Sequence, residues 1–147
     1  MPTLNVSSVL RDRFLACTEG LAGSFRLVLP WPPSVNHVWK IAPRKAYLDS
    51  QVQAFRMRVL AAVKCGRIAG TIPSEPVQGP VAVMLECCPP DRKRRDLDNL
   101  PKSVFDALTK ACVWRDDSQV QLMLPFWGSR AKGGRIVLHV LPLDVEA

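Results

Sequence analysis

The spacing of apolar and polar residues predicts a regular series of strands and helices from residue 25 onward. Four segments are rich in apolar residues and are bounded by proline, glycine or polar residues, as strands usually are. These predicted strands cover residues 25–29, 81–88, 119–126 and 135–141. Two segments between them repeat apolar residues at the period of a helix, one beginning near Asp49 or Ser50 and the other spanning about 99–111. This order favours an α/β or α+β fold, with a mixed sheet and two main helices packed on it.

The first predicted helix ends at Gly66 or Gly70 and turns one apolar side toward the core. That side comprises Val52, Phe55, Val59, Ala62 and Val63. Before it, residues 37–48 are expected to form a hairpin or an ordered loop.

Residues 1–24 stand apart from this pattern as an N-terminal extension, and residues 25–147 form the predicted domain. Val6, Leu10, Phe14, Cys17 and Leu21 share one face of a short amphipathic helix. We expect this element to cover an edge of the sheet or to fray.

The composition changes the picture in one respect, because a net charge of +7 and a pI near 9.5 point to a polyanionic partner. Nucleic acid, an acidic membrane and simple solubility all fit this charge. No apolar run is long enough to cross a bilayer, and Arg11, Asp12 and Arg13 interrupt any signal-peptide core. The five cysteines have no metal-binding spacing, so we expect reduced thiols and a cytoplasmic protein.

The candidate chemistry lies in residues 91–102 and in the pair Asp116-Asp117. Four consecutive basic residues, 92–95, stand beside several carboxylates. The basic residues attract phosphate and the carboxylates repel it. A site that needs both places metal ions between the carboxylates and a phosphodiester.

Local geometry links these residues to the second predicted helix. Asp96 and Asp98 are two positions apart, so on an extended segment both side chains point the same way. Asp98 is a suitable N-cap for a helix that begins at Asn99, and Pro101 is tolerated in its first turn. Lys102 lies one turn from Asp98, away from the buried stripe, within reach of a metal-bound water or a phosphate. Asp116-Asp117 follows the helix, so the chain must fold back or a second subunit must contribute.

Each piece also has a purely structural interpretation. Two aspartates with one residue between them most often mark a solvated loop, and Lys102 with Asp106 forms an ordinary surface pair at helical spacing. Asp116-Asp117 suits a turn, and residues 92–95 suit a generic anion-binding surface. Together on a basic chain, these pieces leave a nuclease and a plain DNA-binding module equally open.

A family resemblance favours the nuclease. Residues 94–100 with Lys102, residues 105–109, and Trp114 with Asp116-Asp117 closely resemble the signature of the RusA Holliday junction resolvases. The same holds for residues 29–34 with Asn36 and for residues 132–135, and the resemblance covers about residues 25–142 in the right order.

The resemblance implies a homodimer of small α/β subunits that nicks two opposed strands of a four-way (Holliday) DNA junction in recombination and repair. It implies Mg²⁺ as the cofactor, with Mn²⁺ as a substitute. The essential carboxylates of the family fall on Asp96, Asp98 and Asp117, which are the expected metal ligands, and the essential lysine falls on Lys102. Asp116 matches a neighbouring acid of lesser consequence.

DNA-backbone contacts are expected from basic residues near this segment, and Arg95 matches a residue implicated in junction binding. The full predicted set is Arg92, Lys93, Arg94, Arg95, Lys45 and Lys132. The sequence departs from the family pattern at Pro101 and at Cys88-Pro89, and residues 1–24 have no counterpart in it.

Two alternative functions remain open: a nuclease for flaps or forks, and a catalytically silent DNA-binding protein of the same fold.

Overall fold

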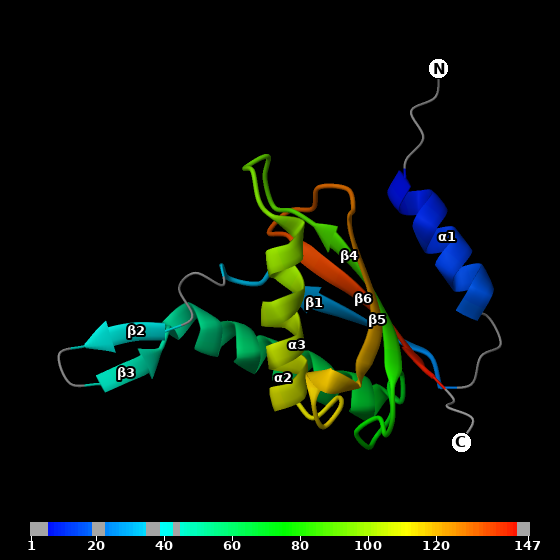
Figure 1. Ribbon diagram of the computed structural model, residues 1–147, viewed down its shortest axis with the longest axis horizontal. Coiled ribbons are helices and arrows are strands. Elements are labelled where there is room, and N and C mark those ends of the chain that lie inside the picture. Colours follow the sequence, from blue (N-terminus) through cyan, green and yellow to red (C-terminus); the bar gives the residue numbers. More distant parts are fainter. Residues whose placement is uncertain (1–5, 19–22, 35–38, 43–44, 144–147) are drawn as a thin grey trace.

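A mixed four-stranded sheet forms the centre of the molecule (Figure 1). The computed structural model describes residues 6–18, 23–34, 39–42 and 45–143, without the side chains of residues 6, 7, 10, 17, 18, 39–42 and 45–48. The strands are β1 (Phe25–Pro30), β4 (Val81–Cys88), β5 (Val120–Trp127) and β6 (Arg135–Pro142), in the order β1-β6-β4-β5. Only the β4–β5 pair is parallel. The predicted fold class is confirmed, and each predicted strand lies within one residue of its observed bounds.

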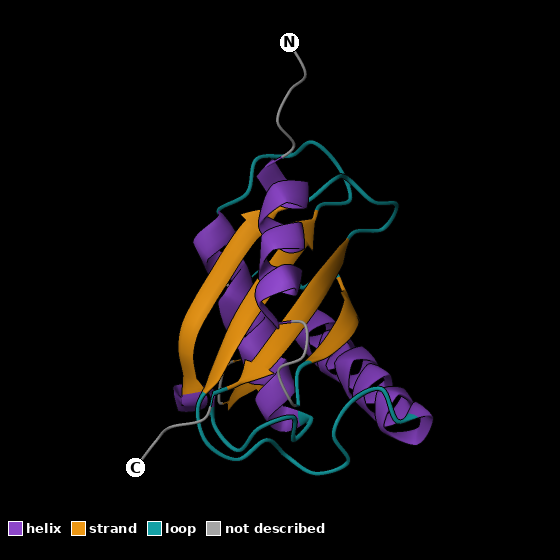
Figure 2. Ribbon diagram, turned by 90° about the vertical axis from the view of Figure 1, so that its right-hand side faces the viewer, coloured by secondary structure: helices purple, strands orange, loops and turns teal. Residues whose placement is uncertain are grey.

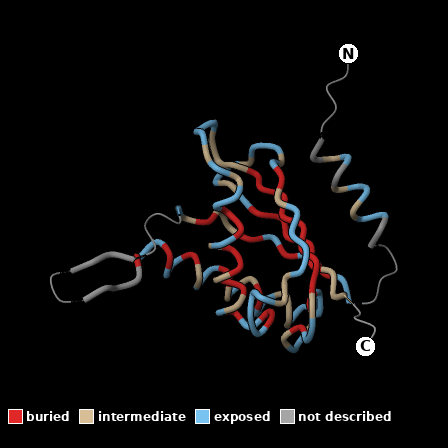
Figure 3. The backbone as a smooth tube through the Cα atoms, viewed as in Figure 1, coloured by how far each residue is buried: buried red, intermediate tan, exposed pale blue. Residues whose placement is uncertain are grey.

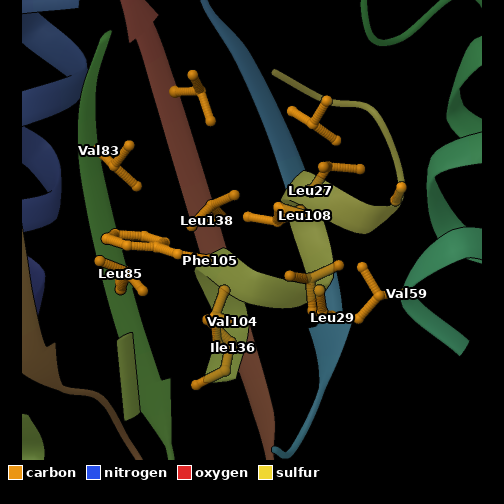
Figure 4. Close-up of a cluster of buried hydrophobic side chains, with 14 of the residues drawn as sticks. Leu27, Leu29, Val59, Val83, Leu85, Val104, Phe105, Leu108, Ile136 and Leu138 are labelled. Atoms are coloured by element: carbon orange, nitrogen blue, oxygen red, sulfur yellow. The ribbon is translucent and has the colours of Figure 1, made fainter. Parts of the chain in front are cut away.

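Two helices pack on one face of this sheet, α2 (Ser50–Ala69) and α3 (Leu100–Lys110). Leu29, Leu85 and Ile136 from the strands meet Val59 of α2 and Val104 of α3 in the buried core (Figure 4). Removing these apolar side chains from water is the main force that holds the two layers together.

The ends of α2 follow the sequence signals. The Asp49 carboxylate accepts a hydrogen bond of 2.8 Å from the Gln51 N–H and caps the helix. Gly70 ends it in the left-handed conformation, with φ of 74°, which costs glycine little. Four of the five residues predicted to face the core are fully buried; Ala62 is only partly buried.

The β4–α3–β5 unit sets the positions of the predicted site residues. The chain leaves the end of β4, passes through a 3₁₀ turn at Leu97–Asn99 (η2), and runs back along α3. A second 3₁₀ turn, Asp117–Gln119 (η3), then leads into β5, whose first residue pairs with Val81, the first residue of β4. The two turns therefore lie toward opposite ends of α3 (Figure 1).

The helix α1 (Val6–Thr18) lies over the other face of the sheet (Figure 2). Its Phe14 ring lies 6.0 Å, centroid to centroid, from His139 of β6. Burial lowers the pKa of His139, and the charges of Arg26 and Arg11 lower it further, so the imidazole is kept neutral. The structure has a helix at the predicted place, and its amphipathic character stays a prediction, because Phe14 is the only residue of the predicted apolar face whose side chain is described. The expectation that this helix covers a sheet edge or frays stays a prediction: Phe14 and Leu15 line a pocket with Phe25 and Arg26 of the edge strand β1 as well as with His139 of β6.

The strands β2 (Trp39–Ala42) and β3 (Lys45–Leu48) form the predicted antiparallel hairpin. No helix in the described part has the length and apolar character needed to cross a bilayer. Four described cysteines are free thiols; Cys87 and Cys88 are buried, and Cys65 and Cys112 are exposed.

Exposure differs sharply between neighbouring strands (Figure 3). Every residue of β4 is buried, whereas β5 is exposed over most of its length. β4 lies between two strands and under helices, and β5 is an edge of the sheet.

Candidate functional site

The segment after β4, residues 89–96, is held in shape by a local ion pair. The Arg95 guanidinium lies 2.7 Å from the Asp91 carboxylate, which also accepts a 2.9 Å hydrogen bond from the Lys93 N–H. These two hydrogen bonds lower the pKa of Asp91 to about 2. Asp91 is thus charged at any physiological pH, and through Arg95 it anchors the four consecutive basic residues 92–95 (the basic segment).

Three segments that are distant in the sequence converge around this anchor. Arg95 also lies over the Trp31 ring, 5.4 Å from its centroid, in a cation–π contact. Gly134, with φ of 70°, packs so closely that an added Cβ would lie 2.9 Å from atoms of both Trp31 and Pro90. Three segments therefore meet at one end of the sheet: the proline-rich residues 30–33, the basic segment, and the glycine turn of residues 132–135.

A basic pocket of about 440 Å³ opens at this end. Arg92, Lys93 and Arg94 line it from the basic segment, together with Trp127 at the end of β5 and Arg130 in the following loop. The three basic residues are exposed, in contrast to the half-buried Arg95. A concave surface with several cations and an aromatic ring suits a nucleic-acid backbone with a base stacked beside it.

A second pocket, of about 240 Å³, is lined by Arg94 and Arg95 of the basic segment and by one of the predicted acidic residues, Asp96. It is lined by Asp96 and Asn99 on one side and by Trp31, Pro32 and Ser34 on the other. Asp96 is therefore directly next to the phosphate-attracting surface.

Asp98 and Lys102 flank Asn99 and Leu100, which line this pocket, in the sequence at the start of α3. Asp98 is inside the 3₁₀ turn η2, whereas Asp96 is extended, with φ of −93° and ψ of 121°. The expectation that both lie on one extended segment is wrong. So is Asp98 as the N-cap, because Asn99 holds that position and makes no side-chain capping bond. Lys102 is exposed, as predicted.

Asp116 and Asp117 lie at η3, near the other end of α3. Asp116 caps this turn, since its carboxylate accepts a 3.4 Å hydrogen bond from the Ser118 N–H. Hydrogen bonds from Ser118 lower the pKa of Asp116. Desolvation raises the pKa of Asp117, and the nearby carboxylates of Asp116 and Asp106 raise it further. Asp117 is thus the acid of this turn whose surroundings favour the protonated form.

The structure thus brings together only part of the predicted site. Asp96 lines a pocket with Arg94 and Arg95, and Asp98 and Lys102 follow it in η2 and the first turn of α3, whereas Asp117 lies near Asp106 of α3. Among the described residues, no group of three or more His, Cys, Asp or Glu side chains is placed to hold a metal ion. A metal site made of all three aspartates does not fit within one described chain.

Sequence reasoning did not single out Trp127 or Arg130, which line the basic pocket. Arg130 stands two residues before the predicted Lys132, so the local density of basic residues was a usable signal. Trp127 gave none, because a tryptophan at the end of a strand more often packs in a core. The Lys45 side chain lies outside the described residues.

Comparison with known proteins identifies the family. A model of the family described as "Endodeoxyribonuclease RusA" matches residues 30–140, which include every segment of the site described above. The chain belongs to the RusA endodeoxyribonuclease family.

Its similarity to individual RusA proteins extends over most of the chain. It is 37% identical, over 123 residues, to the "Crossover junction endodeoxyribonuclease rusA" of Enterobacteria phage 82. The same identity holds for the RusA proteins of Shigella sonnei strain Ss046 and Escherichia coli strain K12. Each match covers 84% of this chain and 98% of the relative.

Proposed function

We propose that this protein is an endonuclease that resolves four-way DNA junctions by paired, symmetric nicks in recombination and repair. The observation that carries the proposal is the placement of Asp96 in one pocket with Arg94 and Arg95, which also line a larger pocket of basic residues, in a chain of the RusA family. The names of its relatives, crossover junction endodeoxyribonucleases, support the same substrate.

The basic residues bind the DNA backbone in this proposal. Arg92, Lys93 and Arg94 are exposed around the larger pocket and contact phosphates directly. Arg95 acts mainly by fixing the shape of the segment through Asp91 and Trp31. Lys132 and Lys45 extend the binding surface to flanking phosphates.

We propose Mg²⁺ as the cofactor, with Mn²⁺ as a substitute, and Asp96, Asp98 and Asp117 as its ligands. Carboxylate oxygens are the ligands that Mg²⁺ prefers, and the raised pKa of Asp117 marks a carboxylate that a cation would stabilise. Lys102 places a positive charge one turn from Asp98, where it offsets the charge that develops on the attacked phosphate. Among the described residues of one chain, Asp117 forms no group with the other two that could hold a metal ion.

A homodimer follows from the substrate. Resolution needs two nicks at symmetry-related positions, and each chain has one set of these carboxylates, so two copies are required. We expect an interface of more than about 1,000 Å² in total.

We also propose that the endonuclease domain is residues 25–147 and that residues 1–24 are an extension. The family match from residue 30, together with the near-complete coverage of the relatives by 123 residues, supports this division. The free thiols, two of them exposed, support a reducing cytoplasmic location.

The test is a panel of end-labelled substrates with equal sequences: a four-way junction, a flap, a fork and a linear duplex. Each is incubated with the protein, with Mg²⁺ or with a chelator. We expect Mg²⁺-dependent cleavage of the junction at opposed strands and little cleavage of the others. Preferred cleavage of flaps or forks would indicate the alternative nuclease, and junction binding without cleavage would indicate a silent DNA-binding module.

A further inference from the structure

Trp127 places an aromatic ring in a pocket wall that is otherwise mostly basic. It is 40% exposed, and it lines the larger pocket together with Arg92, Lys93, Arg94 and Arg130. A tryptophan that is left this exposed gives up part of the burial that makes the residue stabilising in a core. Its exposed surface is therefore available to a ligand.

The backbone that follows the ring holds it in place. The Gly128 N–H donates a 2.8 Å hydrogen bond to the Cys87 carbonyl, and the Ala131 N–H donates one of 3.1 Å to the Pro89 carbonyl. Gly128 packs so tightly that an added Cβ would lie 2.7 Å from the Cys88 Sγ. The end of β5 and the following loop are thus fixed against the end of β4, with the basic segment lining the same pocket. A fixed ring loses little freedom when a ligand stacks on it.

The charge of this pocket favours nucleic acid over a second protein chain. In the described part of the chain, its four basic residues other than Arg95 form no salt bridge, and Arg95 neutralises the Asp91 carboxylate at 2.7 Å. The centres of protein interfaces are depleted of charged residues, whereas sites for single-stranded nucleic acid combine cations with aromatic rings.

The size of the pocket suits one nucleotide whose base has left its stack. Its volume of about 440 Å³ is within the range of about 300–1,000 Å³ for pockets that enclose small ligands. A regular duplex presents phosphates and base edges to a protein, whereas stacking on tryptophan needs the flat face of a base. Regular stacking is interrupted where the arms of a four-way junction meet, so a nucleotide there leaves its stack at a lower cost than inside a duplex.

The pocket also adjoins the proposed cleavage site. Arg94 and Arg95 line both this pocket and the smaller one, and the smaller one is lined by Asp96 as well. A DNA strand that passes from one pocket to the other therefore carries a nucleotide at Trp127 close to the phosphate at Asp96.

We propose that Trp127 stacks on the base of one unpaired nucleotide, next to the phosphate that is cleaved, and that the surrounding basic residues hold the adjoining phosphates. This rests on the proposed function only in taking a four-way junction as the ligand. Trp127 is then the residue that distinguishes a branch point from a duplex. The basic residues do not make this distinction, because a phosphate has the same charge in both.

The test is a double-mutant cycle between the protein and the base. Four-way junctions are prepared with abasic sites, which keep the sugar and phosphate, at one symmetric pair of positions at a time around the branch point. Binding is measured in chelator, so that no cleavage occurs. At one pair of positions, the wild type should bind the abasic junction about tenfold more weakly than the intact one, and Trp127→Leu should bind both equally. Trp127→Phe keeps an aromatic face and should restore most of the difference.

The matched control is Arg130→Ala, in the same pocket. It removes a phosphate contact, so it should weaken binding of intact and abasic junctions by the same factor and lower the log–log salt slope by about one unit. Trp127→Leu should leave that slope unchanged, together with the affinity for a linear duplex.

Equal binding of intact and abasic junctions by the wild type at every position would overturn the proposal. So would a Trp127→Leu protein that keeps the full preference for the intact junction, or one that binds every DNA more weakly by the same factor. A monomeric Trp127→Leu protein beside a dimeric wild type, in sedimentation, would assign the ring to a subunit interface instead.

Cleavage of the intact junction by the wild type in Mg²⁺ is measured in parallel. Its presence in any of those cases leaves the proposed function standing. The expected binding pattern without cleavage of any DNA would support the stacking site and refute the proposed function.

Discussion

At the residue scale, the site contains basic residues together with several carboxylates. The surroundings of each carboxylate affect its negative charge in a different way. Asp91 is neutralised by Arg95, and Asp116 is satisfied by the backbone of its own turn. Asp117 has only acidic neighbours among the groups that shift its pKa. The sequence predicted which residue types gather here. It did not predict that Arg95 has a positioning role, because that depends on the distant Trp31.

Replacing Asp117 with Asn is expected to raise the melting temperature at pH 7. The folded-state pKa of this carboxyl is raised, so the folded protein favours the protonated form and the charged form lowers stability at neutral pH. The gain should shrink as the pH falls toward and below the pKa. Thermal unfolding between pH 3 and 7 measures it.

The matched variant is Asp116→Ala, for which the sign is reversed. The folded-state pKa of Asp116 is lowered, so its stabilising effect is present above the unfolded-state pKa and is lost as the pH falls through the folded-state value. We expect a lower melting temperature at pH 7 and a smaller difference at pH 3. Equal shifts for both variants at pH 7 would contradict this description of the two acids.

The exposed residues of the basic segment, among them Arg94, are expected to govern the salt dependence of DNA binding. Replacing Arg94 with Ala removes one phosphate contact and should lower the log–log salt slope by about one unit. The Arg94→Ala/Arg95→Ala double variant should also flatten the slope. Arg58→Ala, on the exposed side of α2, is the control and should leave the slope unchanged. An unchanged slope for Arg94→Ala would mean that the segment is merely solvated.

At the scale of elements, the sequence predicted the β4–α3–β5 unit well, because its signals are local. Apolar periodicity marked the buried stripe of α3, and proline ended the preceding strand. The 3₁₀ turn at Leu97–Asn99 was missed, since capping preferences alone do not distinguish a helix start from a turn that leads into one. Because of this turn, Asp96 and Asp98 have different backbone conformations: Asp96 is extended and Asp98 is in the 3₁₀ turn.

Lys102 is expected to act in cleavage without being required for binding. The Lys102→Ala variant should lose nicking by at least about 100-fold, about 2.7 kcal/mol of transition-state stabilisation, while junction affinity changes little. Lys110→Ala is the matched control, since Lys110 is an exposed lysine in the last turn of the same helix, and it should retain wild-type nicking. Gel-shift and single-turnover assays separate the two effects. Equal losses in binding and nicking would assign Lys102 to backbone binding alone.

At the scale of the whole molecule, the layered architecture could be predicted but the subunit interface could not. Strand order depends on contacts between distant segments, so it could not be predicted from the sequence that β4 and β6 are inner strands. Val81 of β4 and Ile136 of β6 therefore offer no free sheet edge to a second subunit, and both are buried in the core. The edges of the four-stranded sheet are β1 and β5.

A charge on the β5 edge is expected to dissociate the dimer. Leu122, Met123 and Leu124 are exposed apolar residues of the edge strand β5, which makes this edge the expected contact of the proposed homodimer. Met123→Lys places an ammonium group there, and sedimentation at micromolar concentration should show a monomer that does not nick junctions. Val28→Lys is the matched control, because Val28 is 46% exposed on β1, the opposite edge. A dimeric Met123→Lys protein, or dissociation by Val28→Lys alone, would place the interface elsewhere.

The most direct test of the central claim uses a supercoiled plasmid that extrudes a cruciform, which is a four-way junction. Two nicks on opposed strands within one binding event convert this plasmid to a linear product, whereas a single nick gives an open circle. With Mg²⁺ and the wild-type protein, linear DNA should be the first product, and a plasmid without the inverted repeat should stay intact. Open circles that accumulate first, or equal cutting of both plasmids, would contradict junction resolution by paired nicks.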